Sequence, residues 1–116
     1  MSKVYGIHEI ELIPGVDEES FIKFFNQSFT GVDGWTWRLL KGERGQRAGK
    51  YAVLVEIESV EARDRWSPTS GGSSEERLRW LEEHKEEQEN FAKAWASFSP
   101  TDMLLHPEYT DYLELE

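Results

Sequence analysis

The run VYGIHEIELIPGVDEESFIKFF, residues 4–25, contains the first folding unit of the chain. Its first half is rich in β-branched and aromatic residues and stops at Pro14-Gly15, a turn signal, which predicts a strand over residues 4–12. Asp17 then offers a side-chain cap for a helix that we expect to run to about residue 29. The strand therefore leads through a tight turn into a helix with the apolar face Phe21, Ile22, Phe24, Phe25 and Phe29.

Similar local signals place the other elements. The expected elements are strands over residues 35–40, 51–58 and 109–115, a short helix over residues 60–66, and a longer, unbroken helix from about residue 73 to residue 98. Ser59 can cap the short helix, and Ser73 with Glu76 forms a capping box for the longer one. His106-Pro107 is read as a break before the last strand.

The order of these elements is strand, helix, strand, strand, helix, strand. Two βαβ halves with right-handed crossovers fold into a ferredoxin-like plait, an α+β fold in which helices cover one face of a four-stranded antiparallel sheet. At 116 residues the chain is long enough for one such domain, and we expect residues 1–116 to form it alone.

The sheet face turned away from the helices should be polar in a monomer. Either choice of face instead leaves several large apolar side chains on the strands. Leaving that area in water forgoes about 25 cal/mol per Å² of burial and favours aggregation. We therefore expect a homodimer that buries one sheet against the other.

Composition excludes several classes of partner. The 13 basic and 23 acidic residues give a formal net charge of −10, which repels nucleic acid and anionic membranes. The stretch GKYAVLVEI also places valines where an RNA-recognition domain of the same element order needs stacking rings. The chain has no cysteine and no apolar run of signal-peptide or membrane-spanning length, so we expect a cytoplasmic protein.

Two polar residues, His84 and Gln88, fall on the apolar side of the predicted long helix, in the stripe of Phe91 and Trp95. Two interpretations remain open. In the structural one, a backbone carbonyl or the Gln88 amide satisfies His84. In the functional one, His84 and Gln88 face a cavity between this helix and the sheet, with Phe91 and Trp95 as its walls. A neutral imidazole there can act as a base, a hydrogen-bond donor or a haem ligand.

His8 lies in the middle of the first predicted strand and can share that cavity with His84 if its face meets the helices. Its structural alternative is a cross-strand partner such as Glu56 or Arg38. Arg38 can hold the carboxylate of a ligand or pair with Glu56. His84 and His8 are thus the candidate catalytic residues, with Arg38 as a candidate ligand-binding residue.

Other charged groups carry weaker signals. The three histidines lack the spacing of a zinc site, and we expect no bound metal. No helix start follows the basic segment 41–50, so it does not fit a nucleotide phosphate loop, and we expect it to be a solvated turn that pairs with an acidic helix of a neighbour. Glu9 and Glu11 lie on one strand face, where either a solvent-facing end or acid–base chemistry is possible.

The run at residues 4–25, followed by SVEARDRW and EEHKEEQENF, resembles the dimeric α+β barrel superfamily, including stress-responsive barrel domains and antibiotic-biosynthesis monooxygenase-like proteins. The resemblance covers most of the chain as an order of elements and implies two plaits paired into a barrel. Similar members bind aromatic polyketides or haem, and others have no known activity. In the haem-degrading branch an iron-ligating histidine on the second helix follows a tryptophan. His84 matches the histidine, and Trp66 or Trp80 matches the tryptophan. The first strand here has Gly6 and His8 where that branch has an asparagine, and SPTSGGSS lengthens the spacing from Trp66 to His84.

Three hypotheses follow for function. In the first, the dimer binds a small aromatic or apolar molecule beside His84, with a cofactor-independent monooxygenase as its catalytic form. In the second, the chain is a non-enzymatic structural homodimer whose polar helix residues are internally satisfied. In the third, implied by the resemblance alone, the ligand is haem. The packing next to His84 distinguishes the first two.

Overall fold

Eight elements make up the part of the chain that the structure describes, residues 2–29, 34–69, 72–101 and 110–115 of a computed structural model. In chain order they are β1 (Val4–Ile10), α1 (Glu18–Ser28), β2 (Trp35–Lys41), β3 (Tyr51–Ile57), α2 (Val60–Trp66), α3 (Glu75–Glu83), α4 (Lys85–Ala96) and β4 (Thr110–Leu113). β1 is shorter than predicted because the backbone N–H of Glu11 donates to the Thr101 hydroxyl instead of continuing the strand. The predicted break at His106-Pro107 lies outside the described residues.

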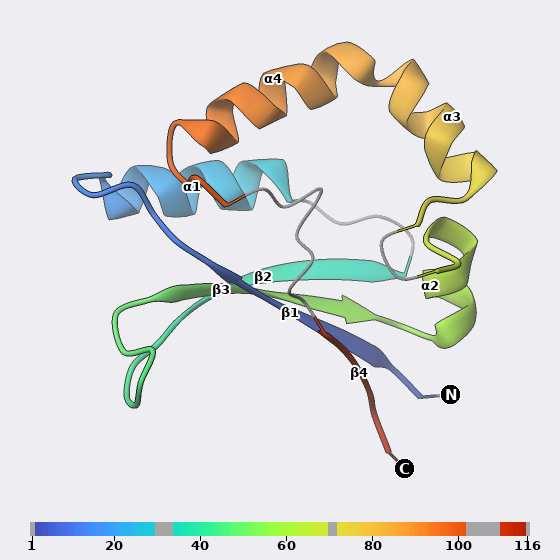
Figure 1. Cartoon of the computed structure of the whole chain (residues 1–116), viewed down its shortest axis with the longest axis horizontal. Coiled ribbons are helices and arrows are strands. Elements are labelled where there is room, and N and C mark those ends of the chain that lie inside the picture. Colours follow the sequence, from blue (N-terminus) through green and yellow to red (C-terminus); the bar gives the residue numbers. More distant parts are fainter. Residues whose placement is uncertain (1, 30–33, 70–71, 102–109, 116) are drawn as a thin grey trace.

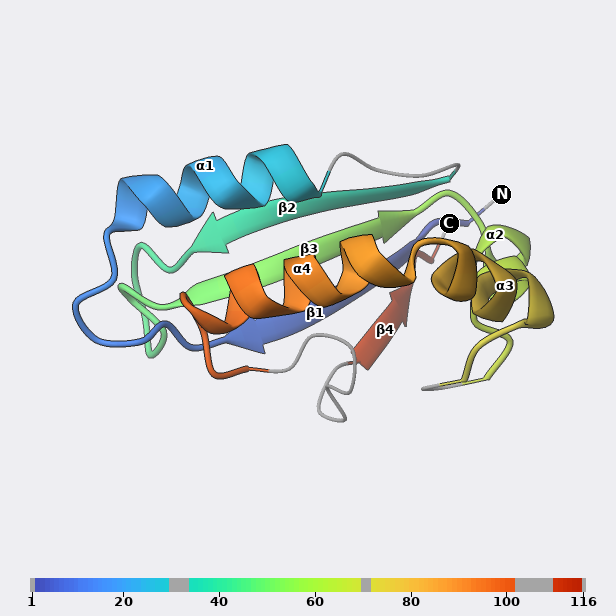
Figure 2. The same cartoon turned by 90° about the horizontal axis from the view of Figure 1, so that it is seen from above.

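The four strands form one antiparallel sheet in the order β2-β3-β1-β4. In the middle of β1, Gly6 faces Val55 of β3 on one side and Asp111 of β4 on the other. α1 and α4 lie over the same face of the sheet, and α2 and α3 lie at the end where β3 finishes (Figures 1 and 2). The predicted α+β class with a four-stranded antiparallel sheet is confirmed, and the described residues place no helix on the opposite, open face.

Alternation along the strands separates a helix-facing side from the open face. In β3, Val53 and Val55 are buried, whereas Leu54 between them is half-buried on the open side. Phe21 and Phe25 of α1 pack on the helix-facing side, together with the buried residues Val4, Ile10, Tyr51, Ile57 and Trp95. Ile22, predicted to be buried, is 37% exposed, so the apolar face of α1 is narrower than expected.

Side-chain caps start α1, α2 and α3, and the sequence predicts the first two of these residues. Asp17 and Ser59 each accept a hydrogen bond from a backbone N–H in the first turn of α1 and α2, at 3.2 Å and 3.1 Å. The cap of α3 is Ser74, which accepts from the Arg77 N–H at 3.1 Å, rather than the predicted Ser73. Two adjacent serines offer the same hydroxyl, so the pattern does not distinguish between them.

The prediction of one long helix is wrong, because the helix is broken at His84 into α3 and α4 (Figure 1). His84 has φ −111° and ψ 24°, outside the helical range. The backbone bonds on either side survive, since the His84 N–H donates to Trp80 at 3.0 Å and the Gln88 N–H donates to His84 at 2.9 Å. The His84 ring also bonds the Trp80 carbonyl oxygen, so a local side-chain bond accompanies this bend, which contains neither proline nor glycine.

The basic segment between β2 and β3 pairs within its own chain. Arg47 lies 3.4 Å from Glu9, and Lys50 lies 3.8 Å from Glu11. The turn folds back beside the end of β1, and the expected contact with an acidic helix of a neighbour stays a prediction. Glu9 and Glu11 are exposed ion-pair partners at this end of the sheet.

The carboxylate of Glu18 joins the start of α1 to the same turn. Lys41 Nζ lies 2.7 Å from Glu18 Oε2, and the Tyr51 hydroxyl donates to the same oxygen. These hydrogen bonds, from Lys41 first and Tyr51 second, hold the pKa of Glu18 below its ordinary value. A carboxyl with a lowered folded-state pKa stabilises the fold above its unfolded-state pKa, and that contribution is lost as the pH falls through the folded-state pKa.

We therefore expect Glu18→Gln to unfold at a lower urea concentration than the wild type at neutral pH, with the difference vanishing in acid. Urea midpoints measured across a pH series check this. Glu19→Gln, which removes the neighbouring carboxylate of the same first turn, is the control and should shift the midpoint less. A Glu18→Gln difference of equal size at neutral and acid pH would contradict the ion-pair assignment.

Candidate functional site

The end of the molecule formed by α2 and α3 is packed differently from the core. No residue of α2 or α3 is buried, although both helices are fully described. Three half-buried rings meet there: Trp66 and Trp80 lie edge to face at 5.8 Å, and Trp80 stacks on His84 at 4.3 Å with 19° between the planes. These three rings form a continuous aromatic stack from α2, through α3, to the break before α4.

The hydrogen bond of His84 fixes which nitrogen carries its proton. Nδ1 lies 2.8 Å from the Trp80 carbonyl oxygen, and since a carbonyl can only accept, Nδ1 is the donor. This is the backbone bond that the structural interpretation predicts. In a neutral ring, Nε2 is then the nitrogen with the lone pair, which can accept a hydrogen bond or bind a metal.

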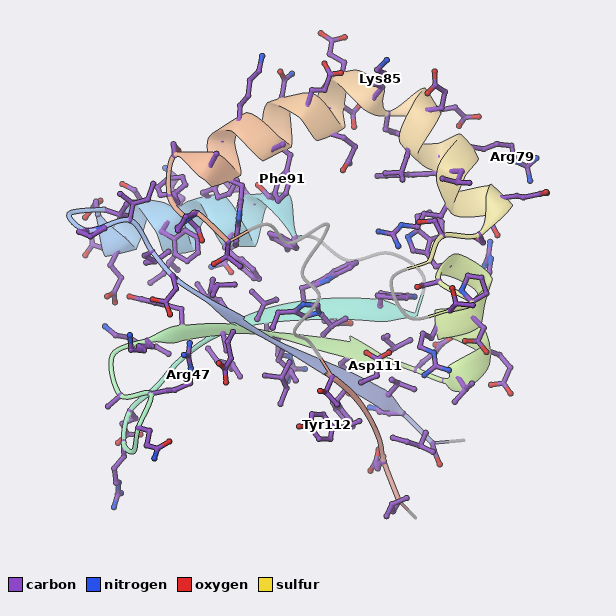
Figure 3. The ribbon with its side chains drawn as sticks, viewed as in Figure 1. Arg47, Arg79, Lys85, Phe91, Asp111 and Tyr112 are labelled. Atoms are coloured by element: carbon purple, nitrogen blue, oxygen red, sulfur yellow. The ribbon has the colours of Figure 1, made fainter. Side chains whose placement is uncertain are left out.

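Phe91 and Trp95, predicted as cavity walls, belong to the dense core between α1 and α4. Phe91 points from α4 towards the sheet (Figure 3) and stacks on Phe24 at 5.7 Å. Trp95 is buried, with its Nε1 donating to the Thr101 carbonyl oxygen at 2.6 Å. Gln88 is half-buried on α4, one turn after His84. Phe91 and Trp95 therefore fill the core rather than flank the aromatic stack.

His8 lies on the helix-facing side of β1, in phase with the buried Val4, Gly6 and Ile10. A Cβ placed on Gly6 would lie 3.6 Å from His8 Nε2 and 3.3 Å from Asp111 Oδ1. The missing side chain of Gly6 thus lets the imidazole and the carboxylate converge over the sheet. Figure 3 shows Asp111 on the helix side of β4 and Tyr112 on the opposite side.

Arg63 connects this polar pair to the aromatic stack. Its Nη1 lies 3.9 Å from Asp111 Oδ2, and its Nε donates to Asp64 Oδ1 at 3.0 Å. Burial raises the pKa of Asp111 above its ordinary value, and the charge of Arg63 opposes that rise. On α2, Trp66 follows Arg63 by three residues, so both side chains lie on neighbouring positions of one helix face.

We name this set the α2 site, after the helix that joins its two halves: His8, Arg63, Trp66, Trp80, His84 and Asp111. The sequence singled out His84, His8, and Trp66 or Trp80, but missed Arg63 and Asp111 as site residues. A weak signal existed for Arg63, one helical turn before Trp66. No local signal marks Asp111, because its position opposite Gly6 depends on the β1–β4 register.

Arg38 lies on the other side of the sheet. Its side chain alternates with Trp37 and Leu39, which pack on the core, and its Nη2 lies 3.5 Å from Glu56. The pairing with Glu56 is the structural alternative that the sequence allowed. A shallow groove of about 410 Å³ opens there, lined by Lys3, Gly34, Trp35, Thr36, Arg38, Glu56 and Glu58. The sheet thus separates Arg38 from His8, so the expected cavity does not include Arg38.

Comparisons with protein-family models, with curated proteins and with solved structures found no match for this chain. The resemblance to dimeric α+β barrels therefore stays an expectation from the sequence. Within the described ranges, every helix is too short or too polar to cross a membrane. The same residues contain no group of three or more histidine, aspartate or glutamate side chains placed to hold a metal ion.

Proposed function

We propose that this chain binds a small aromatic molecule at the α2 site, between the helices and the sheet, and that it does so as a homodimer. The proposed fold is a ferredoxin-like plait, and two copies form a dimeric α+β barrel by bringing their open sheet faces together. One observation carries the ligand proposal. The half-buried aromatic stack lies one helical turn from a charged and polar group held over the sheet.

The order of the strands supports the plait. Read from the other edge, the sheet runs β4-β1-β3-β2, so each βαβ half contributes one inner and one outer strand. In each half the connection places one helix, α1 or α4, over the same face of the sheet (Figure 2). Two right-handed crossovers produce this arrangement.

The open face supports pairing with a second copy. It exposes 41% of Ile7, 43% of Leu40 and 55% of Tyr112, which is unusual for large apolar side chains on a sheet. Its described charges are nearly balanced within the chain, since Lys3 and Arg38 pair with Glu56 and Arg47 pairs with Glu9. A locally balanced face lets two copies of a strongly acidic chain meet without strong repulsion.

The α2 site brings together the kinds of side chain that line ligand pockets. Small-molecule sites join apolar and aromatic surface to a few convergent polar groups. Here the rings of Trp66 and His84 form the ends of the stack, and Arg63, Asp111 and His8 supply the polar groups. In the catalytic form of this proposal, a cofactor-independent monooxygenase, His8 is the base that takes a proton from the ligand.

Two alternatives each have an observation in their favour. The non-enzymatic homodimer is favoured by His84, whose Nδ1 is satisfied by the backbone carbonyl oxygen of Trp80. Haem binding is favoured by the same bond, because iron-ligating histidines usually donate their other nitrogen to a carbonyl and present Nε2 to the metal. Titration with haemin distinguishes the two alternatives, since only haem binding predicts a Soret shift that His84→Ala removes.

The binding proposal is tested by calorimetric titration with naphthylmethanol, a neutral two-ring alcohol. We expect the wild type to bind it and Trp66→Leu to bind it about fivefold more weakly, because one ring–ring contact contributes about 1 kcal/mol. Leu78→Ala, which shortens an exposed side chain on α3, is the control and should leave affinity unchanged. No heat of binding to the wild type at millimolar probe, or equal affinity in Trp66→Leu, would overturn the proposal.

A further inference from the structure

The carboxylate of Asp111 is only partly compensated by its cationic neighbour. The 3.9 Å between Arg63 Nη1 and Asp111 Oδ2 exceeds the length of a hydrogen bond, and Arg63 also donates to Asp64. About 30% of the Asp111 side chain is exposed, so a bound molecule can reach it. Its carboxylate oxygens can therefore accept a hydrogen bond from a positively charged donor, such as an ammonium group.

The aromatic half of the α2 site also attracts positive charge. The face of an indole ring carries negative electrostatic potential and holds ammonium groups within about 6 Å of its centre. Trp66, at the end of the stack, belongs to the same face of α2 as Arg63. A flat ligand that contacts Trp66 can therefore place a charged substituent towards Asp111.

The charges of the surrounding helices point the same way. α2 carries two acidic and two basic residues, and α3 carries four glutamates against two arginines. Arg79 of α3 points away from the sheet (Figure 3), and Arg65 is held by Glu76 through two hydrogen bonds of 2.7 and 3.0 Å. With a net charge of −10 over the chain, the field around the site favours cations over anions.

We propose that the ligand of the α2 site is an aromatic cation, with its ammonium group against the Asp111 carboxylate and its ring against Trp66. This inference rests on the proposed function, because it names the chemical class of the molecule bound at the same site. It also separates this site from one for haem or an aromatic acid, whose carboxylates would meet Asp111.

Three probes with the same two-ring group test this charge preference: naphthylmethylamine, naphthylmethanol and naphthylacetate. At neutral pH they are cationic, neutral and anionic. We expect the amine to bind the wild type about tenfold more tightly than the alcohol, as a charge-assisted hydrogen bond provides, and the acetate to bind most weakly. The advantage of the amine should shrink as sodium chloride is added, because the site is partly exposed.

Asp111→Asn identifies the responsible carboxylate. It keeps the size of the side chain and should bring the amine and the alcohol to within about twofold of each other, the residual reflecting the net charge of the chain. Glu114→Gln is the matched control: this carboxylate lies just after β4, accepts from the Tyr5 hydroxyl at 3.4 Å, and should keep the full preference for the amine. Circular dichroism confirms that both variants are folded before titration.

The outcomes separate this inference from the proposed function. If the alcohol binds and the amine is no tighter, or the acetate binds best, the aromatic-cation inference is overturned while the binding site stands. If none of the three probes binds the wild type, both are overturned. The ranking of the probes on the wild type decides the matter even if Asp111→Asn does not fold.

Discussion

Phe21→Ala is expected to lower the free energy of unfolding by about 3–5 kcal/mol. Phe21 is fully buried, and its ring lies within 6 Å of the rings of Tyr51, Trp95 and Phe98, at centroid distances of 5.9, 5.8 and 5.6 Å. It therefore joins α1 to β3 and to the end of α4. Truncation leaves a cavity between rings that are themselves held by other contacts, so the surroundings relax little.

Ile22→Ala is the matched control for this substitution. Ile22 follows Phe21 on the same helix but is 37% exposed, and we expect a loss of about 1 kcal/mol or less. Urea unfolding at one fixed protein concentration measures both, because the stability of a dimer depends on concentration. Similar losses in the two variants would contradict the placement of Phe21 at the centre of the core.

Ile7→Glu is expected to convert the protein to monomers. Ile7 lies in the middle of β1, between Leu54 of β3 and Thr110 of β4, and its side chain is on the open face. In a two-fold symmetric dimer the substitution places a charge on both copies of one interface, and each buried charge without a partner costs several kcal/mol. The effect on the core is small because the side chain points away from it.

Light scattering on a size-exclusion column measures this change directly. Ile22→Glu, which puts the same charge on an exposed apolar position of α1, is the control and should keep the mass of the wild type. Two results would count against the proposed interface: an Ile7→Glu dimer as strong as that of the wild type, or dissociation of both variants alike.

Local chemistry explains which parts of the fold could be read from the sequence. Asp17 and Ser59 cap helices because a short polar side chain at that position has one favourable partner, the N–H of the first turn. The alternation of Val53, Leu54 and Val55 likewise identifies a strand with one buried side. Such signals depend on neighbours in the chain and survive in the structure.

The break at His84 could not be read in this way. The 80–98 pattern has helical periodicity throughout, and the bend coincides with a side-chain bond from His84 to the Trp80 carbonyl and with the stacking of the two rings, neither of which the pattern signals. A helical wheel assumes a straight helix. It therefore grouped His84 with Phe91 and Trp95, although the stack partner of His84 is Trp80.

The candidate site shows the same division between local and distant information. His8 was found because it lies in the middle of a predicted strand, but its neighbour Asp111 lies 103 residues later and meets it only through strand pairing. The side of the sheet on which Arg38 lies could be predicted from the alternation of residues in its own strand. Trp35, Trp37 and Leu39 form the apolar side of β2, and this places Arg38 on the opposite, open side.

The mass of the wild-type protein across a range of concentrations tests the central claim, which is that two copies pair through their open sheet faces. Sedimentation equilibrium from low to high micromolar concentration is the direct measurement. We predict a particle of twice the 13.5 kDa protomer over most of that range. A stable single protomer at every concentration would contradict the pairing of the two sheets.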